Sequence, residues 1–409
     1  MDSITLDVIK LIIIFAAIII ALKLKLKLYL AITIAIFASA IAFQITPLKC
    51  FELLWFTTTA WDTISVLLIL YCITFLQRLL ENRRQLKLAQ QDLNGLFNNR
   101  RINATIAPIF IGLLPSAAAA VICGDIVSDA CQDSLTTGEK AFVTSYYRHI
   151  PESFLPTYSS IIIMCNLSGV NVAEFVFGMI PMVIVLYILG YVFYVRKVPK
   201  ETGMPASQNK LKDLGSLLLH LWTLITIIAL ILAFDLSVLI SVAAVTIIAW
   251  FVYRFKIHEF PGFAKSAFEP VLIVNMFLVL VFKEFLTYSG VVSSLPEFFS
   301  RFSMPAFLIF ALIFFFGSIV SGSTAIVTIC TTIAFAAIPG SGMPLMVLLQ
   351  SCSYAAMQIS PTHVCLTIVV GYYKIGLGEL VKKTIPVIIP FCIIVTLYYL
   401  LLIRLYHFG

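Results

Sequence analysis

The sequence predicts an all-α polytopic membrane protein with about 10 transmembrane helices in two inverted repeats of five spans each. Each repeat is expected to contain a re-entrant helical hairpin and a broken helix. Three observations support this prediction: an extremely apolar composition, apolar runs of helical length, and a similarity between the two halves of the chain at a spacing of 205 residues.

The composition excludes a soluble globular protein. Hydrophobic residues make up 61% of the 409 residues and charged residues only 11%, whereas a soluble domain carries about 25% charged residues. The net charge of +7 does not indicate a nucleic-acid partner, because most Lys and Arg lie in short loops between apolar runs. The nine cysteines are scattered without a Cys-x-x-Cys pair, so we expect reduced core thiols and no metal site.

Apolar runs of about 20 residues match helices that cross a bilayer and exceed the length of barrel strands. The first repeat, 1–195, has predicted spans at 4–22, 28–43, 59–80, 141–167 (broken at Pro156) and 172–195, with a hairpin at about 104–135. A polar cytoplasmic linker is expected at 196–213. The second repeat, 214–409, has predicted spans at 214–234, 236–254, 268–288, 345–373 (broken at Pro361) and 380–405, with a hairpin at about 304–338.

The two halves match without a gap at a spacing of 205 residues. Gly112 then aligns with Gly317, and Pro156-Thr157 aligns with Pro361-Thr362. Interrupted apolar segments at corresponding positions of two halves are typical of a transporter binding site.

Loop charge predicts the orientation. Each half has five spans and a hairpin that does not cross the bilayer, so it crosses the membrane an odd number of times. The second half must therefore be inverted relative to the first. With both termini outside, 22 of the 27 Lys and Arg fall on the inner side, as expected for a multi-pass protein of the inner or plasma membrane.

The chemistry is expected where the helices break. Proline interrupts a helix because it lacks the N–H donor, and the freed backbone groups need partners in lipid. Half-helix N-termini favour anions, and unwound carbonyl groups favour cations. The candidate substrate and ion residues are Ser116, Ala117, Asp125, Pro156, Thr157, Tyr158, Ser159, Ser321, Gly322, Ser323, Thr324, Pro361, Thr362 and His363.

Acidic residues follow the first hairpin tip on one helical face. Asp125, Asp129 and Asp133 are spaced at i, i+4 and i+8. We interpret Asp125 as a coupling-ion or proton site and the other two as solvated. Arg148, His149 and Glu152 precede the first break and are interpreted as a charge cluster at the inner membrane surface.

The order of elements resembles the ion transporter superfamily, whose best-known branch is the divalent anion:sodium symporters. Within it the chain is most similar to the family called domain of unknown function 401. The resemblance rests on the order of elements and on the two intact Pro-Thr pairs, whereas the tips Ser116-Ala117-Ala118 and Ser321-Gly322-Ser323 depart from the family pattern. Both tips lack the Asn of the Ser-Asn-Thr motif, so dicarboxylate specificity and sodium coupling are not carried over.

The resemblance implies a small organic anion, a carboxylate, carried with Na⁺ or H⁺, and a homodimer in the bilayer. It also implies Na⁺ sites near Ser116 and Thr157 and near Ser321 and Thr362. We therefore predict a secondary active transporter that works by alternating access, with no catalytic residues and no cofactor. The alternatives are a cation/proton antiporter that uses Asp125 and a membrane-embedded enzyme.

Overall fold

Five helices are long and apolar enough to cross a bilayer: α4 (Trp61–Asn82), α10 (Val172–Phe193), α11 (Lys210–Ala233), α14 (Pro270–Tyr288) and α20 (Leu377–His407). A helix rises 1.5 Å per residue, so about 20 residues span the hydrocarbon core. The computed structural model describes residues 3–24, 26–85, 88, 99–113, 119–201, 210–234, 236–301, 303–361 and 363–407. Within these ranges the regular elements are helices, with no strand. The chain is a helical membrane protein.

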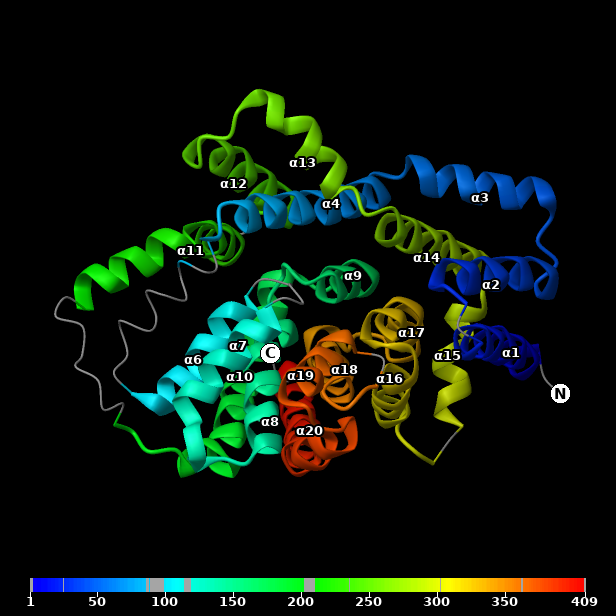
Figure 1. Cartoon of the computed structure of the whole chain (residues 1–409). Coiled ribbons are helices and arrows are strands. Elements are labelled where there is room, and N and C mark those ends of the chain that lie inside the picture. Colours follow the sequence, from blue (N-terminus) through cyan, green and yellow to red (C-terminus); the bar gives the residue numbers. More distant parts are fainter. Residues whose placement is uncertain are drawn as a thin grey trace.

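One group of helices forms an elongated layer that we call the arm (Figure 1). Besides α4, α11 and α14, the arm contains α1 (Ser3–Lys23), α2 (Leu28–Ala42), α3 (Pro47–Thr59), α12 (Val238–Val252), α13 (Phe260–Ala267) and α15 (Val291–Ser300). The predicted span at 59–80 is α4. The preceding residues form the separate helix α3, because Pro47 occupies its first turn and Thr46 caps it by accepting from the Lys49 N–H.

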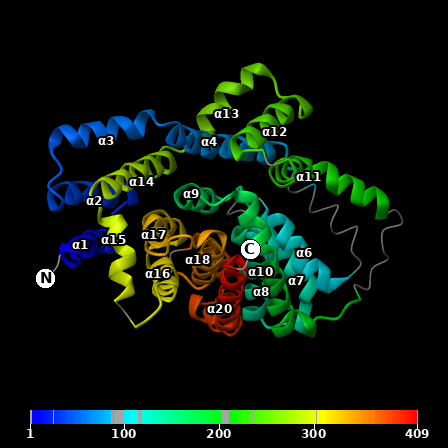
Figure 2. The ribbon, with the colours of Figure 1, turned by 180° about the vertical axis from the view of Figure 1, so that it is seen from behind.

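The remaining helices form a second group, the body, which lies beside the arm in both views (Figures 1 and 2). Besides α10 and α20, it contains α6 (Arg100–Gly112), α7 (Ala119–Cys131), α8 (Thr137–His149), α9 (Ser159–Ser168), α16 (Ala306–Ser321), α17 (Ser323–Ala337), α18 (Gly342–Met357) and α19 (Val364–Tyr373). Arm and body therefore each draw helices from both halves of the chain.

The helices of the two halves pair reciprocally. Helices α9 and α19 begin and end 205 residues apart, and α8 and α18 begin 205 residues apart. In the arm, α4 packs on α12 and α14 packs on α2; in the body, α7 packs on α19 and α17 packs on α9. By their order in the two halves, α2 corresponds to α12, α4 to α14, α7 to α17 and α9 to α19. Each contact between two helices therefore has a counterpart between the two corresponding helices.

Both halves contain a helix that stops inside the body. After α8 the chain forms a short 3-10 turn, η2 (Ile150–Ser153), and resumes as α9 only at Ser159. Helix α18 likewise ends at Met357, and α19 begins at Val364. Helices α16 and α17 meet at Gly322, whereas the junction of α6 and α7 includes residues 114–118, which lie outside the described part.

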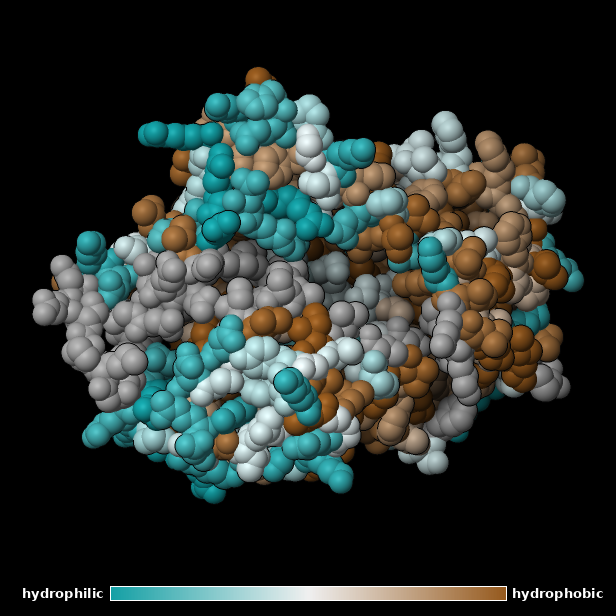
Figure 3. Space-filling view, in the orientation of Figure 1, coloured by the Kyte–Doolittle hydropathy of each residue, from teal (hydrophilic) through white to brown (hydrophobic). Residues whose placement is uncertain are grey.

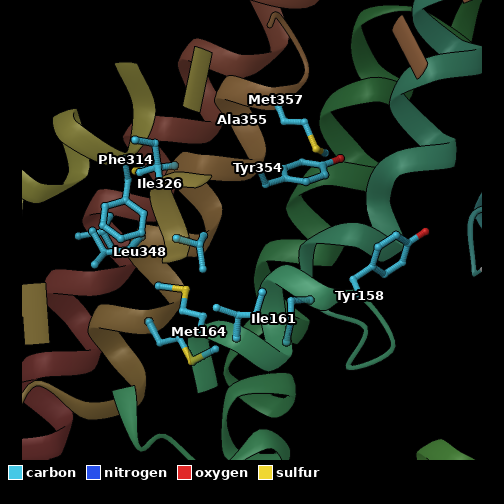
Figure 4. Close-up of a cluster of buried hydrophobic side chains, with 14 of the residues drawn as sticks. Tyr158, Ile161, Met164, Phe314, Ile326, Leu348, Tyr354, Ala355 and Met357 are labelled. Atoms are coloured by element: carbon cyan, nitrogen blue, oxygen red, sulfur yellow. The ribbon is translucent and has the colours of Figure 1, made fainter. Parts of the chain in front are cut away.

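The interior of the body is a continuous apolar core. Figure 4 shows Ile161 and Met164 of α9 near Leu348 of α18 and Phe314 of α16, all in one buried cluster. On the face shown in Figure 3, hydrophobic side chains gather on the side of α1, α2 and α16, and hydrophilic ones over α6 to α8. The core therefore holds α9 and α18 in place, and the start of α9 and the end of α18 border the candidate site.

Ion pairs of Glu139 with two lysines stabilise the start of α8. Thr136 and Glu139 form a capping box, and the Glu139 carboxylate lies 2.8 Å from Lys197 Nζ and 3.6 Å from Lys383 Nζ. Burial alone would raise the pKa of Glu139, but the hydrogen bonds from Lys197 and the Thr136 N–H, together with the Lys383 charge, lower it. These ion pairs join α8 to α20 at the polar edge of the body.

We expect Gly112→Ala to destabilise the body. A Cβ at Gly112 would lie 1.9 Å from the carbonyl oxygen of Arg148, where helices α6 and α8 touch. Overpacking of this kind costs about 1–3 kcal/mol, measurable as a lower Tm in detergent. Gly215→Ala in α11, where a Cβ meets no atom within 4 Å, is the control. Equal Tm values for the two variants would contradict this close contact.

We expect the stabilisation by Glu139 to depend on pH. Its pKa in the folded protein is lowered from a value of about 4.3 in an unfolded chain. The stabilisation is therefore fully present above the unfolded value and is lost as the pH falls through the folded one. The Tm difference between wild type and Glu139→Gln should be largest near neutral pH and vanish in acid. Glu174→Gln, in the first turn of α10, is the control. A Tm difference that stays constant into acid would refute this.

Candidate functional site

A polar cavity of about 360 Å³ lies between the arm and the body. Its lining comes from six helices and the segments between them: Leu28, Glu152, Tyr158, Ser159, Ser160, Asn275, Ser318, Gly322, Ser323, Thr324, Ala325, Met357, Ser360 and His363. Three larger cavities, of about 440, 550 and 680 Å³, are lined almost wholly by apolar side chains, as expected of grooves filled by lipid acyl chains. The polar cavity is therefore the candidate site.

Three helix N-termini meet at this cavity. The N-cap residues of α9, α17 and α19 are Tyr158, Gly322 and His363, and all three line it. None of these caps accepts a side-chain hydrogen bond from its helix. The first N–H groups of a helix have no intrahelical acceptor and carry partial positive charge. The cavity thus offers three groups of backbone donors to an anion.

Gly322 makes the junction of α16 and α17 possible. Its φ of 85° and ψ of 151° lie in a region that only glycine adopts without strain. The junction is held against α18 by Ser353, whose hydroxyl oxygen lies 2.8 Å from that of Ser318 and 2.7 Å from that of Ser323. Ser360 donates to the Ile319 carbonyl at 2.8 Å, which ties the second helix break to α16.

A buried charged cluster adjoins the first helix break. The side chain of Arg148 is 1% exposed, and its Nη1 lies 3.6 Å from the Glu152 carboxylate and 2.9 Å from His149 Nε2. His149 is fully buried, and its Nε2 lies 2.9 Å from His363 Nε2 of the second break. The two helix breaks are therefore joined directly through two histidine rings.

Sequence reasoning placed Arg148, His149 and Glu152 in a charge cluster at the inner membrane surface; the structure shows that Arg148 and His149 are buried inside the body and that Glu152 is 13% exposed. The α8 helix is packed on all sides, its last turn brings Arg148 and His149 to Cys365 and His363 of the second break, and Glu152 follows in η2. The signal that was available is the polarity of the segment before Pro156, where charges stand in an otherwise apolar region. Asn275, Ser318 and Ser360 also line the cavity and were not among the expected residues.

The structure brings part of the predicted site together. Tyr158, Ser159, Gly322, Ser323, Thr324 and His363 line the cavity. Pro156 lies in an apolar crevice with Val176 and Ile184, and the buried Thr157 hydroxyl has no partner within the described residues. Pro361 is exposed, and Ser321 ends α16. Ser116, Ala117 and Thr362 lie outside the described residues.

Asp125 is apart from the cavity. It is exposed on α7, and the hydroxyl group of Tyr372 donates to its carboxylate at 2.5 Å. Tyr372 belongs to the last turn of α19, at the end opposite to His363. Asp125 is not among the lining residues, so the structure does not bring it into the cavity.

Three potential metal-ligating atoms lie within 4.8 Å of one another, on His149, His363 and Cys365. Arg148 Nη1 lies 2.9 Å from His149 Nε2 and 3.5 Å from Cys365 Sγ. A guanidinium is permanently positive and only donates hydrogen bonds. It therefore occupies the lone pairs of His149 Nε2 and Cys365 Sγ that a metal cation would need, and its charge repels such a cation. The group is therefore better suited to hydrogen bonding than to metal binding.

We expect Ser353→Ala to lower the Tm by weakening the junction at Gly322. The substitution removes the oxygen shared by Ser318 and Ser323, and leaving a buried hydroxyl unpaired costs about 1–3 kcal/mol. Ser351→Ala is the matched control, because Ser351 is equally buried on α18 and its hydroxyl donates to the weakly accepting Met179 sulfur. Equal Tm values for Ser353→Ala and Ser351→Ala would show that the shared Ser353 hydroxyl does not stabilise the junction.

Comparison with known proteins identifies the family and the fold. The family model described as protein of unknown function (DUF401) matches residues 7–403, which confirms the resemblance to that family. No curated protein matches the chain. Among solved structures, the chain is similar to the Alcanivorax borkumensis YdaH transporter, with a TM-score of 0.61 and 13% identity over 87% of this chain and 89% of that one. The chain belongs to the DUF401 family and has the helical fold of a membrane transporter.

Proposed function

We propose that this protein is a secondary active transporter that moves a small organic anion, a carboxylate, together with Na⁺ or H⁺ by alternating access. The observation that carries the proposal is the convergence of three helix N-termini without side-chain caps on one polar cavity between arm and body. Such an arrangement favours negative charge without a cofactor. The similarity to the fold of the YdaH transporter supports transport in general.

The size and charge of the cavity suit a small carboxylate. A volume of about 360 Å³ is near the lower end of ligand sites, about 300–1,000 Å³. The hydroxyl groups of Ser159, Ser160 and Ser323 add donors beside the backbone N–H groups. Arg148, adjacent to the cavity, supplies a positive charge that the Glu152 carboxylate partly offsets. This balance favours one carboxylate over several.

The mechanism that we propose rests on two inverted repeats, each with a re-entrant hairpin. The helix bounds that recur 205 residues apart and the reciprocal pairings support a two-fold relation between the halves. The distribution of Lys and Arg supports inversion across the membrane, with both termini outside a cell membrane. The arm would be the scaffold and the body the moving element that carries the cavity.

We also propose a homodimer formed through the arm, with Na⁺ sites near Ser116 and Thr157 and near Ser321 and Thr362 if sodium is the coupling ion. The buried Thr157 hydroxyl, which lacks a partner within the described residues, supports a ligand at the first position. A cation/proton antiporter based on Asp125 is not favoured, because that residue lies outside the cavity. The clustering of donors favours binding of an anion over an enzymatic reaction.

The proposal is tested with the purified full-length chain and a panel of acetate, pyruvate, succinate and citrate. We expect at least one of them to raise the Tm, because a ligand that binds only the folded state stabilises it by RT ln(1 + [L]/Kd). The same anion should exchange across proteoliposomes in counterflow. The proposal fails if none of the four anions shifts the Tm or shows counterflow. Transport of Na⁺ or H⁺ in the absence of any anion would then favour the cation/proton antiporter.

We expect Gly322→Ala to reduce anion binding and counterflow at least tenfold. A side chain at a φ of 85° strains the junction and moves the N-terminus of α17 away from the cavity. Gly371→Ala, on an exposed surface of α19 where a Cβ meets nothing within 4 Å, is the control. Unchanged counterflow in Gly322→Ala would show that this N-terminus does not contact the anion.

A further inference from the structure

The two histidine rings that join the helix breaks differ in what they can do, and their hydrogen bonds show how. His149 Nδ1 lies 2.5 Å from the carbonyl oxygen of Ser145, which only accepts, so Nδ1 carries a hydrogen. His149 Nε2 lies 2.9 Å from Nη1 of Arg148, which only donates, so Nε2 must accept. These contacts define His149 as a neutral ring with its hydrogen on Nδ1.

The tautomer of His363 follows from that of His149. The two Nε2 atoms are 2.9 Å apart, a distance that requires one hydrogen between them. His149 Nε2 carries none, so His363 Nε2 must donate, and the two donors Arg148 Nη1 and His363 Nε2 share the single lone pair of His149 Nε2. In the neutral His363 ring, Nδ1 then keeps a lone pair. A second proton can bind there without breaking the bond between the two rings.

His149 cannot take that proton in this arrangement. A hydrogen on its Nε2 would face both the Arg148 guanidinium and the His363 N–H, so two hydrogen bonds would be replaced by donor–donor contacts. His149 is also fully buried, whereas His363 is half-buried and lines the cavity. Of the two rings, only His363 has both contact with the cavity and a ring nitrogen, Nδ1, without a hydrogen-bond partner among the described residues.

We propose that His363 is the proton-coupling residue of this transporter and binds one proton together with each anion. This inference rests on the function proposed above and deepens it, because it selects H⁺ over Na⁺. The proton binds to His363 Nδ1 and leaves from it, so no covalent bond or redox change is involved. The anion in the cavity is the partner that makes the charged ring favourable.

The groups around His363 explain why proton and anion bind together. Arg148 and His149 face it from α8, Glu152 faces it from η2, and Cys365 lies beside it on α19. The positive charge of Arg148 and the N-terminus of α19 both oppose a cationic ring. A carboxylate in the cavity offsets both effects. By linkage, the proton must then raise the affinity for the anion by the same factor.

The other elements that pack on α19 do not bring charges to His363. Helix α7 meets α19 at its far end, where Asp125 contacts Tyr372 and Ser128 contacts Tyr373. Helix α20 directs Lys383 and Glu379 at residues 138 and 139, in the first turn of α8, far along that helix from His149. The electrostatic environment of His363 is therefore set by α8, η2, Cys365 and the occupant of the cavity.

The test uses proteoliposomes of the full chain with an inward proton gradient of one pH unit and the probe anion identified by counterflow. One proton per anion should give about tenfold accumulation, since one pH unit corresponds to 1.36 kcal/mol. In His363→Gln the steady-state accumulation should fall to the level seen without a gradient, even if the substitution in the cavity lining also slows counterflow, because counterflow needs no net driving force. His258→Gln, an exposed histidine in the arm, is the control and should accumulate like wild type.

The outcomes separate the inference from the function on which it rests. Counterflow without proton-driven accumulation in wild type, or accumulation retained by His363→Gln, overturns the inference and leaves the transporter intact. No counterflow in wild type overturns both. Stabilisation of wild type by Zn²⁺ alone, lost in His363→Gln, would instead make the histidine pair a metal site and would also overturn the inference.

A second measurement needs no variant. Ring-¹⁵N NMR of the histidine-labelled wild type should show one of the five histidines changing from neutral to charged when the probe anion is added near neutral pH. The His149 signal should keep its Nδ1–H form throughout. Absence of any charge change on anion binding would overturn the inference even if His363→Gln does not fold.

Discussion

Unpaired backbone groups at helix interruptions are the constraint on which the rest of this structure depends. In a bilayer, each N–H or C=O group without a partner costs several kcal/mol. Here the interruptions before α9, α17 and α19 face one cavity, so their donors share a single polar space between arm and body. Gly322, the Ser353 hydroxyl and the apolar core below hold these helix ends in place. The structure thereby keeps donors ready for an anion.

The buried charge of Arg148 also determines how the polar groups at the two helix breaks are arranged. A guanidinium in a low-dielectric interior is tolerated only when it is paired and hydrogen-bonded, and Arg148 has Glu152, His149 and Cys365 around it. The same contacts orient His149, which in turn orients His363 on the other half of the chain. Arg148 and the Ser145 carbonyl therefore determine the tautomer of His149 and, through it, that of His363. The junction between the two halves is consequently polar, specific and sensitive to charge in the cavity.

Much of the fold could be predicted because its causes are local. Apolar runs of spanning length, prolines at 156 and 361, and a similarity at a fixed spacing are properties of the chain in one dimension. The predicted spans correspond to long helices such as α4, α10 and α20, and the interruptions lie where proline prevents regular hydrogen bonding. The predicted spans do not include α3, because its start at Thr46-Pro47 directly follows an apolar run and its own residues are less apolar than those of a membrane span.

The sequence by itself determined that this chain is a helical membrane protein of the DUF401 family, with interrupted helices at matched positions. Only the tertiary structure decided which side chains share the cavity. Arg148 and His149 look interfacial in one dimension, yet packing of α8 on all sides buries them beside His363. Asp125 looks embedded, yet α7 leaves it exposed beside Tyr372. Proximity between residues more than 200 positions apart is a property of packing, and no local pattern encodes it.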